Sequence, residues 1–119
     1  MKKNKPLPPA VPFDLHGWTV KEIKKDEAFR TEYLKGLITE KDVPVLMDNL
    51  HDLVTALGGV GKLARGTGLN RQALYKSLSG KVTPDFRTLL KIINYAGYDL
   101  SIAKMKRDKK EQRALAFAR

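Results

Sequence analysis

Residues 63–80 read LARGTGLNRQALYKSLSG, a pattern that predicts two short helices joined by a tight turn. Ala64 is small enough to let the two helices approach closely. Gly68 can adopt, without strain, the left-handed backbone that such a turn needs. Asn70 is a favoured N-cap for the second helix. The segment therefore predicts a helix-turn-helix whose junction is filled by the side chains of Leu63, Leu69, Leu74 and Leu78.

The second of these helices is expected to expose a polar and cationic face, because Leu74 and Leu78 lie four residues apart and face inward. In the major groove of DNA, Arg71 can fork onto O6 and N7 of guanine, and Gln72 can pair with N6 and N7 of adenine. The expected base-reading residues are Arg71, Gln72, Tyr75 and Lys76, and the expected contacts to backbone phosphate are Lys62, Asn70, Ser79 and Lys81.

The net charge of +10 is distributed unevenly along the 119 residues. Residues 60–83 carry five basic side chains and no acidic one, whereas residues 13–59 carry nine acidic and six basic side chains. Residues 1–12 and 104–119 are also basic, with net charges of +3 and +5. A basic stretch that coincides with a folded motif indicates a polyanionic partner, although charge alone is explained as well by solubility.

Two helices are expected before the motif, preceded by a short helical turn over residues 18–23. Asp26 is placed to cap the first helix, which should break at residues 39–41. Asp42 is placed to cap the second, with Pro44 in its first turn, and the glycines at 58–59 should end it. Their apolar stripes are Phe29, Tyr33, Leu34, Leu37 and Ile38 in the first helix, and Val43, Leu46, Leu50, Leu53, Val54 and Leu57 in the second.

One helix and one strand are expected after the motif. Thr83 and Pro84 signal a helix start with proline at the first helical position, and Gly97 signals the helix end. Apolar residues then alternate with small or polar ones over residues 98–103, which predicts a strand. A lone strand needs a partner, so the same strand of a second subunit is expected to pair with it. The inward face of this last helix should carry Phe86, Leu89, Leu90, Ile93 and Ala96.

The fold class expected from these patterns is mainly α: a helical bundle that contains the helix-turn-helix, with one short C-terminal strand paired across a dimer. Five segments are expected along the chain. They are a flexible, basic, proline-rich arm (1–12), an N-terminal helical segment (13–41), a helix-turn-helix domain (42–97), a strand (98–103) and a basic tail (104–119).

Several function classes have no support in the sequence. Cysteine is absent, and His16 and His51 are far apart with no ligand set near either, so neither a metal site nor a cofactor is expected. No pair of carboxylates, nucleophile–base set or phosphate loop stands out, so an enzyme is not expected. No apolar run approaches the roughly 18 residues of a membrane span, and a cytoplasmic location is expected.

Residues 58–80, together with 83–93 and the glycine-then-strand pattern of 97–102, resemble the Xre-type, HigA-like helix-turn-helix of addiction-module antidote proteins. The resemblance covers roughly residues 13–103 and implies a lambda-repressor-like fold. It also implies an antitoxin of a type II toxin–antitoxin module, which binds a small basic RelE/ParE-like toxin and represses its own operon as a homodimer on double-stranded DNA. In that case the acidic residues of 13–59 are the candidate toxin-facing surface.

Three alternatives remain open on the residues alone. The chain could be a stand-alone helix-turn-helix repressor of prophage type without a toxin partner. It could be an adaptor that binds a partner and whose motif no longer reads DNA. An RNA-binding role fits the charge, but no aromatic stacking platform is visible.

Overall fold

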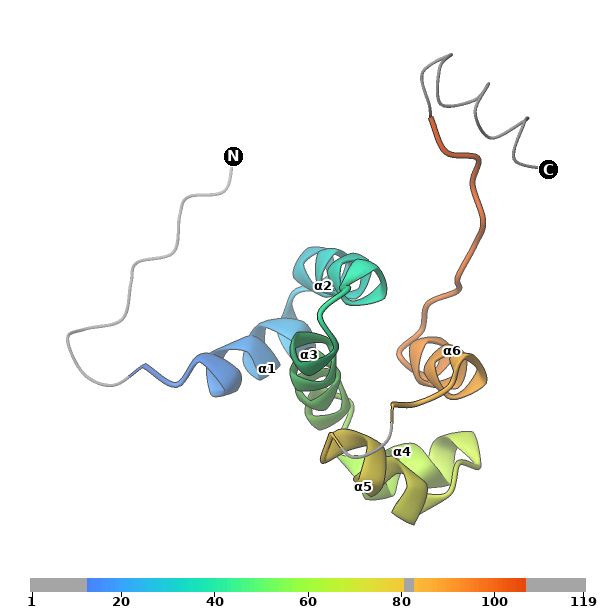
Figure 1. The fold of residues 1–119 in the computed structure, drawn as a ribbon. Helices are drawn as coiled ribbons and strands as arrows, with labels where there is room; N and C mark the ends of the chain where they lie inside the picture. The colour runs from blue at the N-terminus through green and yellow to red at the C-terminus, as the bar shows by residue number, and fades with distance from the viewer. Residues whose placement is uncertain (1–12, 81–82, 107–119) are drawn as a thin grey trace.

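Six helices follow one another along the part of the chain that the computed structural model describes, residues 13–80 and 83–106. They are α1 (Leu15–Lys25), α2 (Glu27–Thr39), α3 (Val43–Ala56), α4 (Val60–Thr67), α5 (Arg71–Leu78) and α6 (Phe86–Tyr95). Helix α3 is central: α1 and α2 pack against it, and α4 and α5 lie at its C-terminal end (Figure 1). The expectation of a mainly helical fold is confirmed. The predicted arm (1–12) and most of the predicted basic tail (104–119) lie outside the described residues.

Aspartates begin the first three helices by capping their free backbone N–H groups. The side chain of Asp14 accepts from Gly17 N at 2.9 Å, that of Asp26 from Phe29 N at 3.1 Å, and that of Asp42 from Val45 N at 3.3 Å. The caps predicted at Asp26 and Asp42 are therefore confirmed. The turn predicted over residues 18–23 is too short, because Asp14 caps a helix that begins at Leu15, three residues earlier, and ends at Lys25.

The core lies where all six helices contribute apolar side chains. Three residues expected to face inward are exposed instead: Ile38 by 45%, Val43 by 48% and Phe86 by 65%. Val43 and Phe86 are the first residues of α3 and α6, and Ile38 is the second-last residue of α2, so each lies in an end turn of its helix. The buried apolar residues are Ile23, Leu34, Leu37, Met47, Leu50, Leu53, Val54, Leu63, Leu74, Ile92 and Ile93.

The start of α6 differs from its prediction. Pro84 was expected at the first helical position, but it is a buried residue that precedes the helix. Asp85 is the N-cap, and its carboxylate accepts from Thr88 N at 2.8 Å. The carboxylate of Asp85 therefore sets the start of α6, and Pro84 lies before the cap.

The predicted strand over residues 98–103 is wrong for the described chain, which contains no strand in its two ranges. After Gly97, whose φ is 95°, Tyr98 is held against the helices: its carbonyl accepts from Asn94 Nδ2 at 2.7 Å. Its hydroxyl also lies 3.0 Å from Thr31 Oγ1. Beyond that point the chain leads away from the helices (Figure 1), and Ile102 is fully exposed. A ladder needs a second strand, and this segment meets none among the described residues.

Candidate nucleic-acid interface

Helices α4 and α5 are joined by a turn of a few residues centred on Gly68, which has φ 77° and ψ 10°. Thr67 supports the turn with its hydroxyl, which donates to Leu63 O at 2.7 Å and accepts from Leu69 N at 3.2 Å. Leu63 and Leu74 are buried at the junction, and Leu69 and Leu78 pack partly buried against the core. The four leucines therefore fill the junction as the sequence predicts.

Helix α5 begins at the cap predicted for it. The Oδ1 atom of Asn70 accepts from Ala73 N at 2.8 Å, while the residue itself stays exposed. The first turn of a helix carries a partial positive charge and presents free N–H groups, which favours an anion such as a phosphate. Asn70 therefore caps α5 while the N-terminal end of the helix stays accessible to solvent.

The four side chains predicted to read bases all lie on the exposed surface of α5. Arg71, Gln72, Tyr75 and Lys76 are exposed, while Leu74 and Ser77 are buried on the opposite face. The guanidinium carbon of Arg71 lies 5.9 Å from the centroid of the Tyr75 ring, within the range of a cation–π contact. This face can donate hydrogen bonds and carries two positive charges without a neighbouring carboxylate on α4 or α5.

The predicted phosphate contacts are placed less uniformly. Lys62 is exposed on α4, and Asn70 is exposed at the start of α5. Ser79 lies at the other end of α5, where its hydroxyl donates to Lys76 O at 2.8 Å and keeps its lone pairs for another donor. A serine hydroxyl already engaged in this way is a poor phosphate donor, so Ser79 is the weakest of the set. Lys81 lies outside the described residues.

Arg65 belongs with this surface, although the sequence pattern did not single it out. A Cβ atom at Gly61 would lie 3.4 Å from Nη2 of Arg71 and 3.7 Å from Nη1 of Arg65. The two guanidinium groups therefore converge above Gly61, whose missing side chain leaves room for them. The sequence signal that could have identified Arg65 is its spacing from Gly61, because residues four apart lie on one face of a helix.

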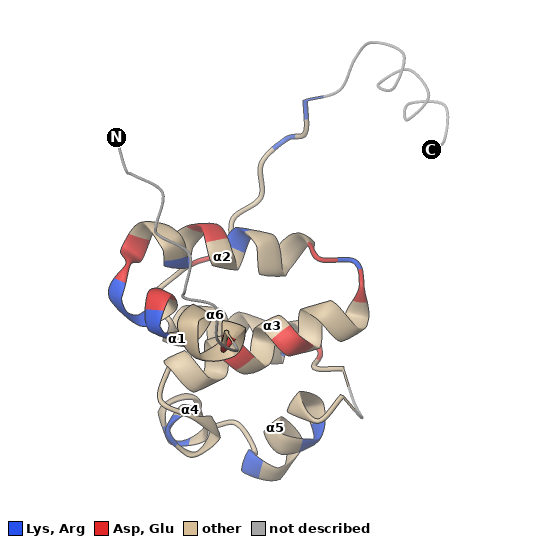
Figure 2. Ribbon diagram, turned by 90° about the vertical axis from the view of Figure 1, so that its left-hand side faces the viewer, with Lys and Arg blue, Asp and Glu red and all other residues tan. Residues whose placement is uncertain are grey.

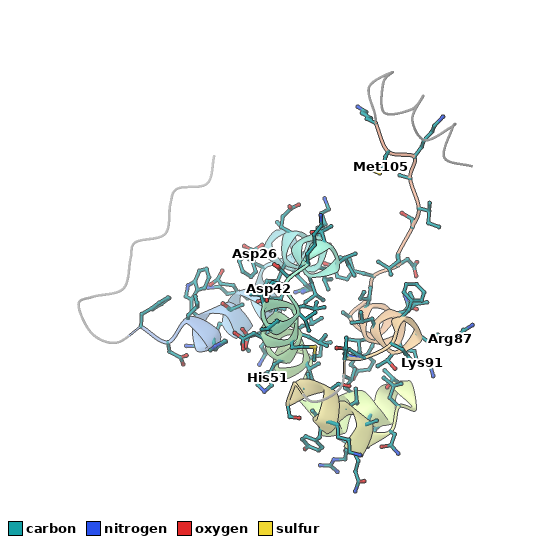
Figure 3. All side chains as sticks on the ribbon, viewed as in Figure 1. Asp26, Asp42, His51, Arg87, Lys91 and Met105 are labelled. Carbon is teal, nitrogen blue, oxygen red and sulfur yellow. The ribbon has the colours of Figure 1, made fainter. Side chains whose placement is uncertain are left out.

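Charge is segregated in space as well as along the chain. Figure 2 shows no acidic residue on α4 and α5, at one end of the described fold, whereas the acidic residues of α1, α2 and α3 lie in the remaining part, with lysines and arginines among them. Arg87 and Lys91 project from α6 away from α1 and form a separate basic surface (Figure 3). An end of the molecule with one sign of charge attracts a polyanion.

His16 has carboxylate neighbours that its sequence position did not reveal. Its Nδ1 atom donates to Asp52 Oδ2 at 2.8 Å, and its Nε2 atom lies 3.8 Å from Asp48 Oδ2. The hydrogen bond to Asp52, followed by the charges of Asp52, Asp48 and Asp14, raises the pKa of His16 above its ordinary value of 6.5. The spacing along the chain does not reveal Asp48 and Asp52, because they meet His16 only where α1 packs against α3. Even so, no group of three or more His, Asp or Glu side chains within the described ranges could hold a metal ion.

A family model described as "Probable addiction module antidote protein" matches residues 14–104, a span that includes all six helices. The chain belongs to this antidote family. Among curated proteins, an uncharacterized protein of Haemophilus influenzae is 33% identical over 61 residues. That match covers 51% of this chain and 62% of the Haemophilus protein, so the chain spans about three fifths of the length of that relative. No solved structure matches.

Two further findings concern the hydrophobicity of the helices and the placement of charge in this antidote family member. No helix in residues 13–80 and 83–106 is long and apolar enough to cross a membrane. Charge also differs between two parts of the described fold: α4 and α5 carry only basic residues, whereas the part with α1, α2 and α3 carries acidic and basic ones.

Proposed function

We propose that this chain is the antitoxin of a type II toxin–antitoxin module, which binds and neutralises a RelE/ParE-like toxin and represses its own operon by binding DNA. The observation that carries the DNA-binding part is the exposed face of α5, where Arg71, Gln72, Tyr75 and Lys76 stand outward from a buried junction. Membership of the antidote family supports the toxin-binding part.

In this proposal α4 and α5 form a helix-turn-helix of the lambda-repressor-like kind, and α5 enters the major groove of the operator. Arg71 forks onto guanine and Gln72 pairs with adenine, because both emerge from the first turn, which points toward the base edges. Lys62 and the N-terminal end of α5 contact the phosphates on either side and fix the register. Arg65 adds a phosphate contact beside Arg71, because the two guanidinium groups lie together over Gly61.

The protein binds DNA as a homodimer in this proposal. A dimer presents two copies of α5, so the operator is a near-palindrome whose half-sites are about one helical turn, ~34 Å, apart. The carboxylates beside α1 and α3, among them the exposed Asp14 and Asp48, face the basic toxin. Neither role needs a catalytic group, and we propose that the protein acts in the cytoplasm as a binding protein rather than an enzyme.

One experiment with two readouts tests both parts. The protein encoded by the neighbouring gene is expressed in a bacterial host alone and then with this chain, while a reporter follows the promoter of the shared operon. We expect growth arrest by the neighbour, rescue by the antitoxin, and a fall in reporter signal. Rescue by a variant with Arg71→Ala and Gln72→Ala, without repression, would separate the two surfaces. If the promoter is repressed but no neighbour arrests growth, the chain is a stand-alone repressor and the antitoxin proposal is wrong.

A further inference from the structure

We propose that the groove between α1 and α3 is where the chain holds its partner, and that its occupant is a cationic, amphipathic segment of the neutralised protein. This inference rests on the proposed function and locates the toxin-binding site within the acidic half of the chain. The occupant is a segment that presents a lysine or arginine side chain next to apolar ones.

The groove is large enough for such a segment. Its volume is about 860 Å³, and it is an open groove that runs between α1 and nearly the whole length of α3, from Val43 to Thr55. Ligand sites in proteins have volumes of roughly 300–1,000 Å³, so the groove can accept several side chains. The C-terminal end of α5, at Leu78, Ser79 and Gly80, closes one end, and His51 lies at that end (Figure 3).

The lining of the groove is mostly apolar. Val20 of α1 and Met47 of α3 both line it, and Val43 and Pro44 at the start of α3 are exposed in the same lining. Val43 is 48% exposed even though it belongs to an apolar stripe. An apolar side chain left in water at a groove lined by others gains free energy when a partner covers it. Cover by a partner would account for the exposure of Val43, which lies one turn before the buried Met47 on the same face of α3.

The polar groups of the groove favour a cation. Asp52 is compensated, because its buried carboxylate accepts from His16 Nδ1 at 2.8 and 3.0 Å. Asp48 is different: its side chain is 66% exposed, and Nε2 of His16 lies 3.8 Å away, beyond hydrogen-bonding distance. Asp14, whose carboxylate also caps α1, and Lys21 are the other charged residues that line the groove. Three carboxylates against one lysine leave the groove with net negative charge even when His16 is protonated, on a chain whose total charge is +10.

Charge complementarity selects the occupant. DNA and acidic peptides are repelled by these carboxylates and attracted to α4 and α5 instead. A lysine or arginine that reaches Asp48 forms an ion pair at the rim of an apolar groove, where water is partly excluded and the pair is less screened. Residues 1–12, which carry Lys2, Lys3 and Lys5, are the competing occupant from the chain itself.

The test uses the full-length chain with isotope-labelled methyl groups and backbone amides. Two synthetic peptides are titrated: an amphipathic one of leucine, alanine, lysine and arginine, and a twin with glutamate at every basic position. We expect the cationic peptide to shift the Val20, Met47 and Asp48 signals, and the acidic twin to leave them unchanged. Asp48→Lys should weaken cationic-peptide binding about tenfold or more, because it reverses a charge at the rim.

Glu32→Lys is the matched control. Glu32 is an equally exposed carboxylate, with a side chain 72% exposed on α2, and it does not line the groove. Its reversal changes the total charge by the same amount, so peptide binding should stay within about twofold of the unchanged chain. Equal weakening by both variants would overturn the proposal, because only bulk charge would then matter. Peptide-induced shifts confined to α4, α5 or α6 would also overturn it.

Two further outcomes separate the groove from its alternatives. If replacing Lys2, Lys3 and Lys5 by serine shifts the groove signals without any peptide, the N-terminal segment is the occupant and the proposal is wrong.

In the growth assay, Asp48→Lys should lose rescue while Glu32→Lys keeps it. Rescue retained by Asp48→Lys overturns the docking site but leaves the antitoxin function intact. Peptide binding at the groove without rescue by the unchanged chain supports the site and refutes the function.

Discussion

The guanidinium of Arg71 lies 5.9 Å from the ring centroid of Tyr75, one helical turn further along the exposed face of α5. The contact limits the rotamers of a long side chain that would otherwise sample many directions in water. An arginine held in this way loses less conformational entropy when it binds, which increases affinity. The pair therefore presents a partly preorganised fork at the start of α5.

Replacing Arg71 and replacing Lys62 should have different effects on DNA binding. Arg71→Ala should cost ~1–3 kcal/mol at the operator and relax the choice at one base pair, because a fork onto guanine is lost. Lys62→Ala should weaken binding about equally for all sequences and reduce the dependence on salt, because a phosphate contact is lost. Fluorescence anisotropy with the operator and a set of single-base variants, at several salt concentrations, measures both. Identical profiles for the two variants would refute the division into reading and positioning residues.

Two substitutions of Asn70 should separate its role as a helix cap from its role at the surface that faces DNA. Asn70→Ala removes the acceptor for Ala73 N and should lower the free energy of unfolding by about 1 kcal/mol. Asn70→Asp keeps a good cap, so its stability should match that of the unchanged chain, but it adds a negative charge where phosphate approaches. Urea unfolding and operator binding, measured on both variants, give the two readouts. Full operator affinity in Asn70→Asp would mean that this end of α5 does not face DNA.

Two glycines within helices should respond to alanine in opposite directions. A Cβ at Gly66 would run into Cε1 of Tyr95 and lie 3.0 Å from its Cδ1 and Cζ, so Gly66→Ala should destabilise the fold by ~1–3 kcal/mol. A Cβ at Gly36 meets nothing within 4 Å, so Gly36→Ala should stabilise α2 by roughly 0.5–1 kcal/mol. Thermal and urea unfolding of the pair tests this. A stabilising Gly66→Ala would show that α4 and α6 are further apart than described.

His16 should make part of the stability depend on pH. Its hydrogen bond to Asp52 and the nearby carboxylates raise its folded-state pKa above 6.5, so the protonated ring stabilises the fold. This contribution is complete below the unfolded pKa and is lost as pH rises through the folded pKa. The stability advantage of the unchanged chain over His16→Gln should therefore shrink as the pH rises from below 6.5 through the higher folded-state pKa. A constant difference across that range would contradict the assignment, since His51 is present in both proteins.

Most helix boundaries follow from local signals and could be predicted from the sequence. Asp26, Asp42 and Asn70 each cap a helix through a backbone N–H three residues ahead, and Gly68 ends α4 in a left-handed conformation. These interactions need only a few consecutive residues, so their spacing is visible in the chain. The exposed face of α5 could be predicted for the same reason, because its two leucines set the buried side of an eight-residue helix.

Features that depend on tertiary packing could not be predicted. His16 and Asp52 are 36 residues apart and meet only because α1 packs against α3. The convergence of Arg65 and Arg71 depends on how α4 crosses α5. The alternation of residues 98–103 is a true sequence signal, but a strand also needs a partner, and the described residues supply none.

The most direct test of α5 as the DNA-reading helix is the ratio of affinities for the operon's own promoter and for a scrambled duplex, measured at physiological salt. The unchanged chain should prefer the promoter by about a thousandfold or more. The variant with Arg71→Ala and Gln72→Ala should keep its helical content and its weak binding to both duplexes while its preference falls toward one. A double variant that still prefers the promoter as strongly as the unchanged chain would show that sequence is read elsewhere on the molecule.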